Sequence, residues 1–469
     1  MNLFNALGTT DAIVFLVYLC VIVAIGFIVS NSVKDDKDFT AAGQNMSLTL
    51  MIGTCLASFF GAYTGSGGLD IAGEIGLTAI TVNLGSALGW FIMGLMAKNM
   101  RRSGALSYPE YISKLFGKDA RTVSSGASMI FLVGQVGGQF AACGTLCVLL
   151  NICNFTTGVV VGGILIVLLT VSGGLVGVAI TDTVQQVFIT ILCVGIIPVV
   201  AVTQAGGVGA IVDYTMATAP HKLSFLRGGD FGRVLALFLS CMLPFTCEPA
   251  YAQRIFAAKD EKTAFWGTHI SWFVSFLLTI PLYACILAAP MLYGEGFYCA
   301  SFIPMTLQTF MPPVIKGLGV AAFCSLLLTT GDTMLLAESS IFTNDIYPMI
   351  KPKTDPKTML RLGRICVVVM GIIAIIMSLW LKRVSTIMLL FNGAYGSCVF
   401  PPVLIANLKG SDYLDKKIIA PCMAIVMVLV LLVDLIPAFP TEGVFIGIPL
   451  HVILLIVATK MSKKKEVII

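Results

Sequence analysis

Val320-Ala-Ala-Phe-Cys-Ser-Leu-Leu-Leu-Thr-Thr-Gly-Asp-Thr-Met-Leu-Leu-Ala-Glu-Ser-Ser340 is the stretch that decides the fold. It is long enough to cross a bilayer as a helix, which takes about 20 predominantly apolar residues. A carboxylate and several hydroxyls nevertheless lie at its middle. At 100° per residue five of its polar side chains fall within an arc of about 100° and share one helical face: Ser325, Thr329, Asp332, Thr333 and Ser340.

This polar face predicts a cation site inside the protein. A carboxylate at membrane depth costs about 3 kcal/mol or more unless it has a partner, so Asp332 should face the interior. No Lys or Arg occurs between Val320 and Tyr347 to pair with it. A row of hard oxygen atoms without a fixed cation suits Na⁺, or a proton on the carboxylate. The alternative is that the hydroxyls bond carbonyls of their own helix and Asp332 is protonated.

The composition indicates an all-α polytopic membrane protein that has the lipid bilayer as a partner. The chain has 469 residues, of which 57% are hydrophobic and only 11% charged, and its mean hydropathy is +0.96. No soluble domain of this size has such a composition. The net charge of +5 reflects basic loops and not a nucleic-acid surface. The 14 cysteines are scattered through apolar runs and suit packing. No metal-binding or nucleophile–base motif, organic cofactor or obligatory protein partner is indicated, so we do not expect an enzyme.

Thirteen membrane spans are predicted from the apolar runs. They cover about 12–30, 47–72, 76–97, 125–150, 157–180, 183–204, 232–256, 265–291, 316–346, 363–381, 385–408, 418–436 and 442–459. Alternate connections carry 23 and 6 of the 29 basic residues. The positive-inside rule then predicts an external amino terminus and a cytoplasmic carboxyl terminus. We expect a multi-pass protein of the plasma membrane, the cell membrane of a bacterium.

Two of these spans should be interrupted at membrane depth. The second carries four glycines between Gly61 and Gly68, and the seventh carries Glu248 between Pro244 and Pro249. Irregular backbone at this depth is tolerated only where it is buried in protein or lines a cavity. The two breaks lie five spans apart, so each would open a five-helix half, a pattern that indicates a binding site near the midplane. The alternative for the glycines is close helix packing.

Several motifs, in order, resemble those of the sodium:solute symporter family over about residues 37–408. They are Asp38-Phe-Thr-Ala-Ala-Gly43, the loop Gly104–Gly117 containing Ser-Tyr-Pro-Glu-Tyr, Gly173-Gly-Leu-Val-Gly-Val-Ala-Ile-Thr-Asp-Thr-Val-Gln185, Gln253-Arg254 with Ala257-Ala258-Lys259, Thr329-Thr-Gly-Asp-Thr333 and Asn344-Asp-Ile-Tyr347. Gly177 departs from the family pattern, which has Ala there.

The resemblance implies a leucine-transporter-like fold of two inverted five-helix repeats with broken first helices. Spans 2–6 and 7–11 would form this core. The chain would divide into an added helix and loop (1–46), a first repeat (47–204), a second repeat with a long external loop (205–408), and two further helices with a basic tail (409–469).

The resemblance also implies a main sodium site and a possible second cation site. The main site would use backbone carbonyls of the broken second span and oxygens of the ninth span: Ala57, Phe60, Leu326, Thr329 and Thr330. The possible second site would involve Asp182, Asp332 and Thr333. Many members have Ser where this chain has Thr329 and Thr330, which keeps the hydroxyls and adds methyl groups.

A substrate site is expected between the two breaks. Matching positions are Phe59, Tyr63, Thr64 and Glu248, and Gln135, Gln139 and Asn392 could complete the site together with Tyr395. Ordinary hydrogen bonding between helices is an equal alternative for these last four. The family often has Asn or Gln at the Glu248 position. A carboxylate there favours a ligand with an ammonium group or several donors, unless Glu248 is protonated or pairs with Arg254.

These observations predict a secondary active transporter. We expect Na⁺-coupled symport of a small organic solute, an amino acid or a carboxylate metabolite, into the cell by alternating access. The alternatives are a proton-coupled symporter with the same fold, in which Asp182, Asp332 or Glu248 carries the proton, and a channel. Paired broken helices argue against the channel.

Overall fold

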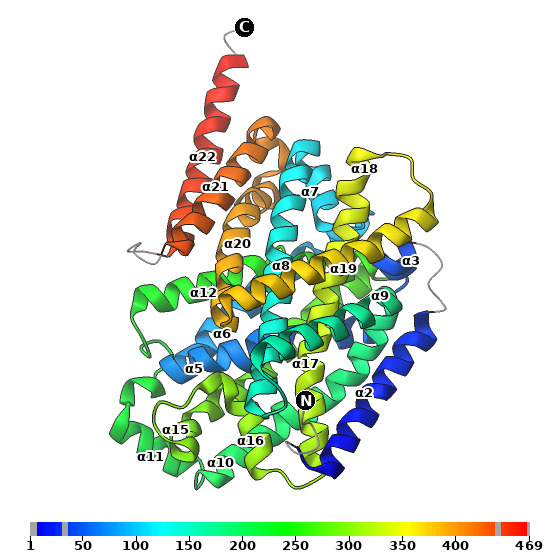
Figure 1. The fold of residues 1–469 in the computed structure, drawn as a ribbon. Coiled ribbons are helices and arrows are strands. Elements are labelled where there is room, and N and C mark those ends of the chain that lie inside the picture. The colour runs from blue at the N-terminus through cyan, green and yellow to red at the C-terminus, as the bar shows by residue number, and fades with distance from the viewer. Residues whose placement is uncertain (1–6, 31–35, 437–441, 467–469) are drawn as a thin grey trace.

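The computed structural model describes residues 7–30, 36–436 and 442–466, and the regular structure within these ranges is helical (Figure 1). The longer helices are α2 (Thr9–Ser30), α6 (Thr78–Arg102), α8 (Lys118–Leu149), α9 (Phe155–Phe188), α12 (Phe231–Phe245), α14 (Glu261–Ala284), α17 (Ile315–Ile341), α19 (Pro356–Leu381), α20 (Val384–Lys409), α21 (Lys416–Leu435) and α22 (Gly443–Glu466). The shorter ones are α3 (Asp36–Ala41), α4 (Leu48–Phe59), α5 (Gly68–Ile75), α7 (Tyr108–Phe116), α10 (Ile197–Gln204), α11 (Val208–Thr218), α13 (Pro249–Ala257), α15 (Ala289–Tyr293), α16 (Phe302–Phe310) and α18 (Tyr347–Ile350). Wider π-type turns link several of them: η2 (Tyr63–Gly67), η3 (Ile189–Ile196) and η7 (Phe342–Ile346). A helix bonds its backbone groups internally, which a bilayer requires.

Eleven helices in the described residues are long and apolar enough to cross a membrane. The bent pair formed by α4 with the segment Tyr63–Ile75 raises this number to twelve if the pair is one span. The predicted number of thirteen is therefore not confirmed. The difference arises at residues 155–204, which form one run of helical structure where two spans were predicted.

Gly174 interrupts that run. Its φ of 57° and ψ of −173° are not helical, and a side chain there would collide with Phe39. Figure 1 shows α9 changing direction along its length. The predicted boundary near residue 181 is wrong, because the helix continues through Asp182. A straight helix of 50 residues would be about 75 Å long, more than twice the thickness of the bilayer core.

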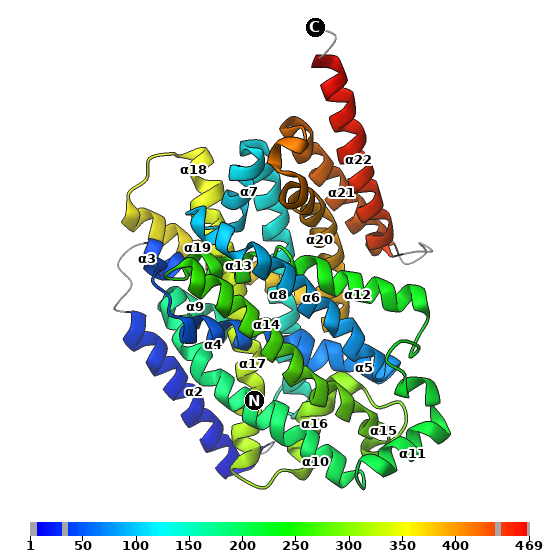
Figure 2. The ribbon, with the colours of Figure 1, turned by 180° about the vertical axis from the view of Figure 1, so that it is seen from behind.

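α17 lies at the centre of the molecule. In its most apolar 18-residue window, 94% of the residues are buried, compared with 28% for α2 and α22. Figures 1 and 2 show α2 and α22 at opposite margins, with α17 between other helices in both views. The helix that carries the polar face is thus surrounded by protein, as a helix with a buried carboxylate requires.

The connecting segments gather at two opposite ends. α7, α18 and the carboxyl end of α22 lie at one end in both views, and α11, α15 and α16 lie at the other (Figures 1 and 2). α7 lies in the connection between α6 and α8. Ser107 accepts a hydrogen bond from the Glu110 backbone N–H at 3.0 Å and so caps its amino terminus.

Candidate functional site

The helix that begins at Leu48 is broken in the middle, as predicted. α4 ends at Phe59, and the chain bends by 45° before it continues through η2 into α5. Phe60 has a ψ of 69°, which ends the regular helix. The backbone N–H of Ala62 then donates to the Gln139 side-chain oxygen on α8 at 2.8 Å. A side chain from another helix thus satisfies a backbone group that the break releases.

The carboxyl end of α4 meets the threonines of α17. Thr329 Oγ1 lies 3.0 Å from the Ala57 carbonyl oxygen, and Thr330 Oγ1 lies 3.1 Å from that of Ser58. Both hydroxyls also lie 3.3–3.5 Å from the Leu326 carbonyl of their own helix. The alternative prediction was that these hydroxyls bond carbonyls of their own helix. They do so, and they contact the broken helix as well. The result is a cluster of uncharged oxygen atoms, which suits a hard cation.

Gly61 allows this close approach. A Cβ atom built at Gly61 would lie 2.5 Å from Thr330 Oγ1 and 2.9 Å from Thr330 Cβ. Both distances are too short for any larger residue unless Thr330 moves. The glycine is thus required where the break touches α17.

Four of the five predicted sodium ligands come together at this junction: Ala57, Leu326, Thr329 and Thr330. Phe60 is buried as well, and its backbone N–H donates to the Leu56 carbonyl at 3.2 Å. The role of all five as ligands stays a prediction.

The second break separates α12 from α13, also as predicted. Pro244 lies in the last turn of α12 and Pro249 is the first residue of α13. Between them, the carbonyl of Cys247 accepts a hydrogen bond from the Tyr395 hydroxyl at 2.8 Å. Tyr395 therefore supports the second break in the way that Gln139 supports the first.

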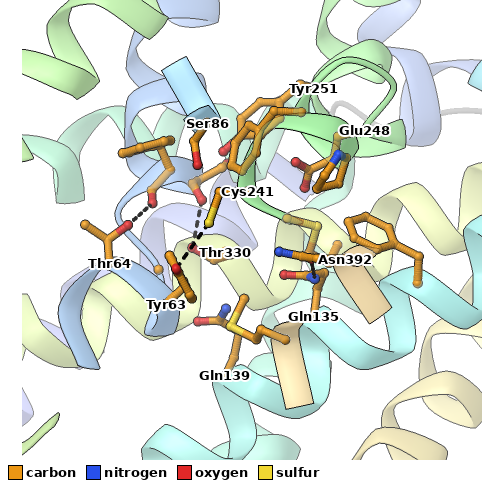
Figure 3. Close-up of a pocket in the computed structure, with 18 of the residues that line it drawn as sticks. Tyr63, Thr64, Ser86, Gln135, Gln139, Cys241, Glu248, Tyr251, Thr330 and Asn392 are labelled. Atoms are coloured by element: carbon orange, nitrogen blue, oxygen red, sulfur yellow. Dashed lines mark hydrogen bonds between the residues drawn. The ribbon is translucent and has the colours of Figure 1, made fainter. Parts of the chain in front are cut away.

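A cavity lies between the two breaks (Figure 3). The space inside it that water can reach is narrow, about 40 Å³, which is enough for a few water molecules. All seven residues predicted for the substrate site line it: Phe59, Tyr63, Thr64, Gln135, Gln139, Glu248 and Asn392. Asn83 and Ser86 of α6 and Cys241 of α12 line it as well. The role of these residues in substrate binding stays a prediction. Ser58 and Thr330 line it as well, so the cavity reaches the oxygen cluster. Tyr395 lies outside the lining.

Hydrogen bonds fix several polar groups around the cavity. The Gln135 amide donates to the Asn392 side-chain oxygen at 2.7 Å, and Thr64 donates to the Phe59 carbonyl at 2.8 Å. The Tyr63 hydroxyl lies 3.2 Å from Cys241 Sγ. Bonding between helices and exposure to the cavity thus occur together for Gln135 and Asn392, which the sequence analysis had treated as alternatives.

Glu248 is the acidic residue of the cavity wall. It precedes α13 but makes no capping bond to that helix, and in Figure 3 its carboxylate points toward the cavity. Its side chain makes no hydrogen bond or ion pair with any described residue. The predicted alternative of a pair with Arg254 is not present.

Arg254 instead occupies the region of the possible second cation site. Its side chain is completely buried. Its Nη2 donates to Thr333 Oγ1 at 2.5 Å and to Thr54 Oγ1 at 3.2 Å, and lies 3.9 Å from Asp182 Oδ2. Thr54 in turn donates to Asp182 at 2.5 Å. A fixed cation therefore already faces Asp182.

Asp332 stays apart from these bonds. It is buried, and its Oδ1 has no hydrogen-bond partner. Oδ1 of Asp182 likewise has no hydrogen-bond partner among the described residues. The second cation site, with Asp182, Asp332 and Thr333, remains a prediction.

The match to a family model decides the identity. Residues 39–408 match the model described as the sodium:solute symporter family. The chain belongs to this family. It is therefore a membrane transport protein and not an enzyme, and its fold is leucine-transporter-like with sodium as the coupling ion.

Two relatives with similar sequences are proline transporters by name. The symporter is 24% identical over 413 residues to an osmoregulated proline transporter of Bacillus subtilis (strain 168), covering 83% of this chain and 82% of the relative. It is 25% identical over 423 residues to a sodium/proline symporter of Staphylococcus aureus, covering 84% and 80%.

Solved structures support the fold. A Na⁺-coupled sialic acid symporter in a substrate-bound outward-open state superposes with a TM-score of 0.82 at 19% identity, covering 97% of this chain and 98% of that one. A nucleobase-cation-symport-1 family transporter in a closed conformation gives 0.57 at 11% identity, covering 90% and 95%.

The sequence analysis missed part of the site. Tyr251 and Phe245 form an aromatic wall, with ring centroids 5.6 Å apart, and Trp90 packs behind Tyr251 at 4.4 Å. Tyr251 lies two residues after the proline that begins α13, so its proximity to the break was the available signal. Nothing local marks Asn83, Ser86 or Cys241, which reach the cavity only through helix packing.

Proposed function

We propose that the protein imports a small organic solute, an amino acid or a carboxylate metabolite, together with Na⁺ by alternating access. Sodium binds at Ala57, Phe60, Leu326, Thr329 and Thr330. The observation that carries the proposal is the contact of Thr329 and Thr330 with the carbonyl oxygens of α4 beside the cavity. A cation there holds the broken helix against α17 and so orders one wall of the cavity.

The coupling energy is sufficient for uphill import. A tenfold sodium gradient supplies about 1.4 kcal/mol. A membrane potential near 100 mV adds about 2.3 kcal/mol for one charge. One ion per cycle thus supports accumulation of a neutral solute by several hundredfold.

We further propose that the amino terminus faces the outside of a bacterial cell and the carboxyl terminus the cytoplasm. The support is the unequal distribution of basic residues over alternate connections. Cysteine labelling from either side tests it. The variant Lys465→Cys should gain labelling, relative to the unmodified protein with its 14 native cysteines, only with reagents that enter the cell. Additional labelling by an impermeant reagent in intact cells would contradict this orientation.

The test of sodium coupling is uptake into proteoliposomes. Vesicles are loaded with potassium and diluted into sodium, and a panel of labelled amino acids and carboxylates is offered, L-proline included. We expect accumulation of at least one solute that disappears when the sodium gradient is dissipated. Uptake driven by a pH gradient without sodium would favour the proton-coupled alternative, with Asp182, Asp332 or Glu248 as the carrier.

A further inference from the structure

We infer that the cavity selects solutes that carry a protonated amine and that Glu248 is the residue that recognises it. This rests on the proposed function and names its substrate class. It separates the two classes that remain open, because a carboxylate metabolite without an amine would meet a like charge in the cavity.

The charge of the cavity wall is the first argument. Among its lining residues Glu248 is the ionisable acid, and no Lys, Arg or His lines the cavity. The nearest candidate counter-charge, Arg254, is held by Thr54, Thr333 and the Ala250 carbonyl, with bonds of 2.5–3.4 Å. The carboxylate is only 3% exposed and has no partner within the described part of the chain. Ionising a buried carboxylate that lacks an ion pair is costly, and an ammonium group of a ligand beside Glu248 would supply that pair.

The position of Glu248 in the second break is the next argument. It lies at the amino terminus of α13, a helix of nine residues, where the helix dipole favours an anion. It makes no capping bond to that helix, so its oxygens stay available to a ligand. Pro249 fixes the start of α13 and therefore the place from which the side chain projects.

The aromatic wall completes the site for a cation. Phe59, Phe245 and Tyr251 line the same cavity, and Tyr251 lies near Glu248 in Figure 3. Aromatic ring faces attract ammonium groups and also accommodate the apolar part of a small solute. The amides of Gln135 and Asn392, which line the same cavity, are neutral and serve the remaining polar groups of the solute.

The experiment compares isosteric pairs on the purified full-length protein. Thermal stability in detergent with saturating sodium is measured against 2-amino acids and the matching analogues in which oxygen replaces the amine. One such pair is L-proline and tetrahydrofuran-2-carboxylate, another is L-alanine and L-lactate, and sugars are added. We expect only amine-bearing members to stabilise the wild type. A panel in which no amine-bearing member binds, or in which an analogue or a sugar binds more tightly, overturns the inference.

The substitution Glu248→Gln then tests the residue. It keeps the shape and removes the charge, so affinity for the best amine should fall about tenfold or more while affinity for its oxygen analogue stays the same or rises. Glu295→Gln, the same change on an exposed loop outside this cavity, should leave both unchanged. Unaltered amine affinity in the Glu248→Gln variant contradicts the assignment even if sodium still enhances binding. Loss of the sodium requirement itself would instead contradict the proposed symport.

Discussion

Replacing Thr329 with valine tests the sodium ligands with little change of shape. Valine keeps the branched side chain but loses the hydroxyl that contacts the Ala57 carbonyl at 3.0 Å. An uncharged group that bonds to an ion contributes about 1.5–3 kcal/mol. Each 1.4 kcal/mol is tenfold in affinity, so the sodium concentration for half-maximal uptake should rise about 10- to 100-fold. Thr329→Ser keeps the hydroxyl and should change this concentration by less than about threefold.

The assay is initial uptake into proteoliposomes as a function of external sodium, at several solute concentrations. Thr343→Val is the matched control, because among the described residues this buried threonine bonds only to carbonyls of its own helical segment, Ser339 and Ser340. It should leave the sodium dependence unchanged. If Thr329→Val shows the sodium dependence of the wild type, the assigned ligand set is refuted, however much its maximal rate has changed.

Three further predictions concern the junction, the buried arginine and a surface cap. Gly61→Ala should abolish or strongly reduce uptake, because the new Cβ must displace Thr330, whereas Gly126→Ala on α8, where nothing lies within 4 Å, should retain normal uptake; equal uptake by both variants would contradict the close approach at the break. Arg254→Met and Asp182→Asn should each lower the free energy of unfolding by about 3–5 kcal/mol, and the double variant by less than their sum; strict additivity in thermal denaturation would show that the two do not interact. Hydrogen bonds from the side chain and the backbone N–H of Thr358 lower the pKa of Asp355, which caps α19. The stability this group contributes is present above its ordinary pKa and is lost as the pH falls through the lowered value. Asp355→Asn should therefore flatten the acid side of the melting-temperature profile, and an unchanged slope would count against the cap.

The meeting of α4 with α17 could be predicted because each side carries a local signal. Four glycines interrupt one apolar run, and two adjacent threonines interrupt another. Membrane depth makes both features costly unless they satisfy each other. The family resemblance then assigned Ala57, Thr329 and Thr330 to one site. In the structure Thr329 contacts the Ala57 carbonyl and Thr330 contacts the carbonyl of the next residue, Ser58.

The position of Arg254 could not be predicted from local spacing. A continuous helix would place it nearly two turns from Glu248, but Pro249 begins a new helix and Glu248 lies outside it. The actual partners, Thr54 and Thr333, are 200 and 79 residues away along the chain. Which acid the guanidinium faces is decided only by the packing of α4, α9 and α17 around α13.

The boundary within residues 155–204 was misplaced for a different reason. Hydrophobicity is nearly continuous through this run, interrupted by polar residues such as Thr181 and Asp182, so it does not mark where one segment ends. Both are buried against other helices. The change of direction comes at Gly174, where the positive φ favours glycine. The pair Gly173-Gly174 was the available signal.

Direct binding of radioactive sodium to the purified protein tests the central claim, that oxygens of the broken α4 and of α17 bind the coupling ion together. Equilibrium binding would be measured for the wild type and for the double variant Thr329→Val with Thr330→Val, with Thr343→Val as the control. The account predicts saturable binding to the wild type and the control that is lost in the double variant. Undiminished saturable binding in the double variant would contradict it.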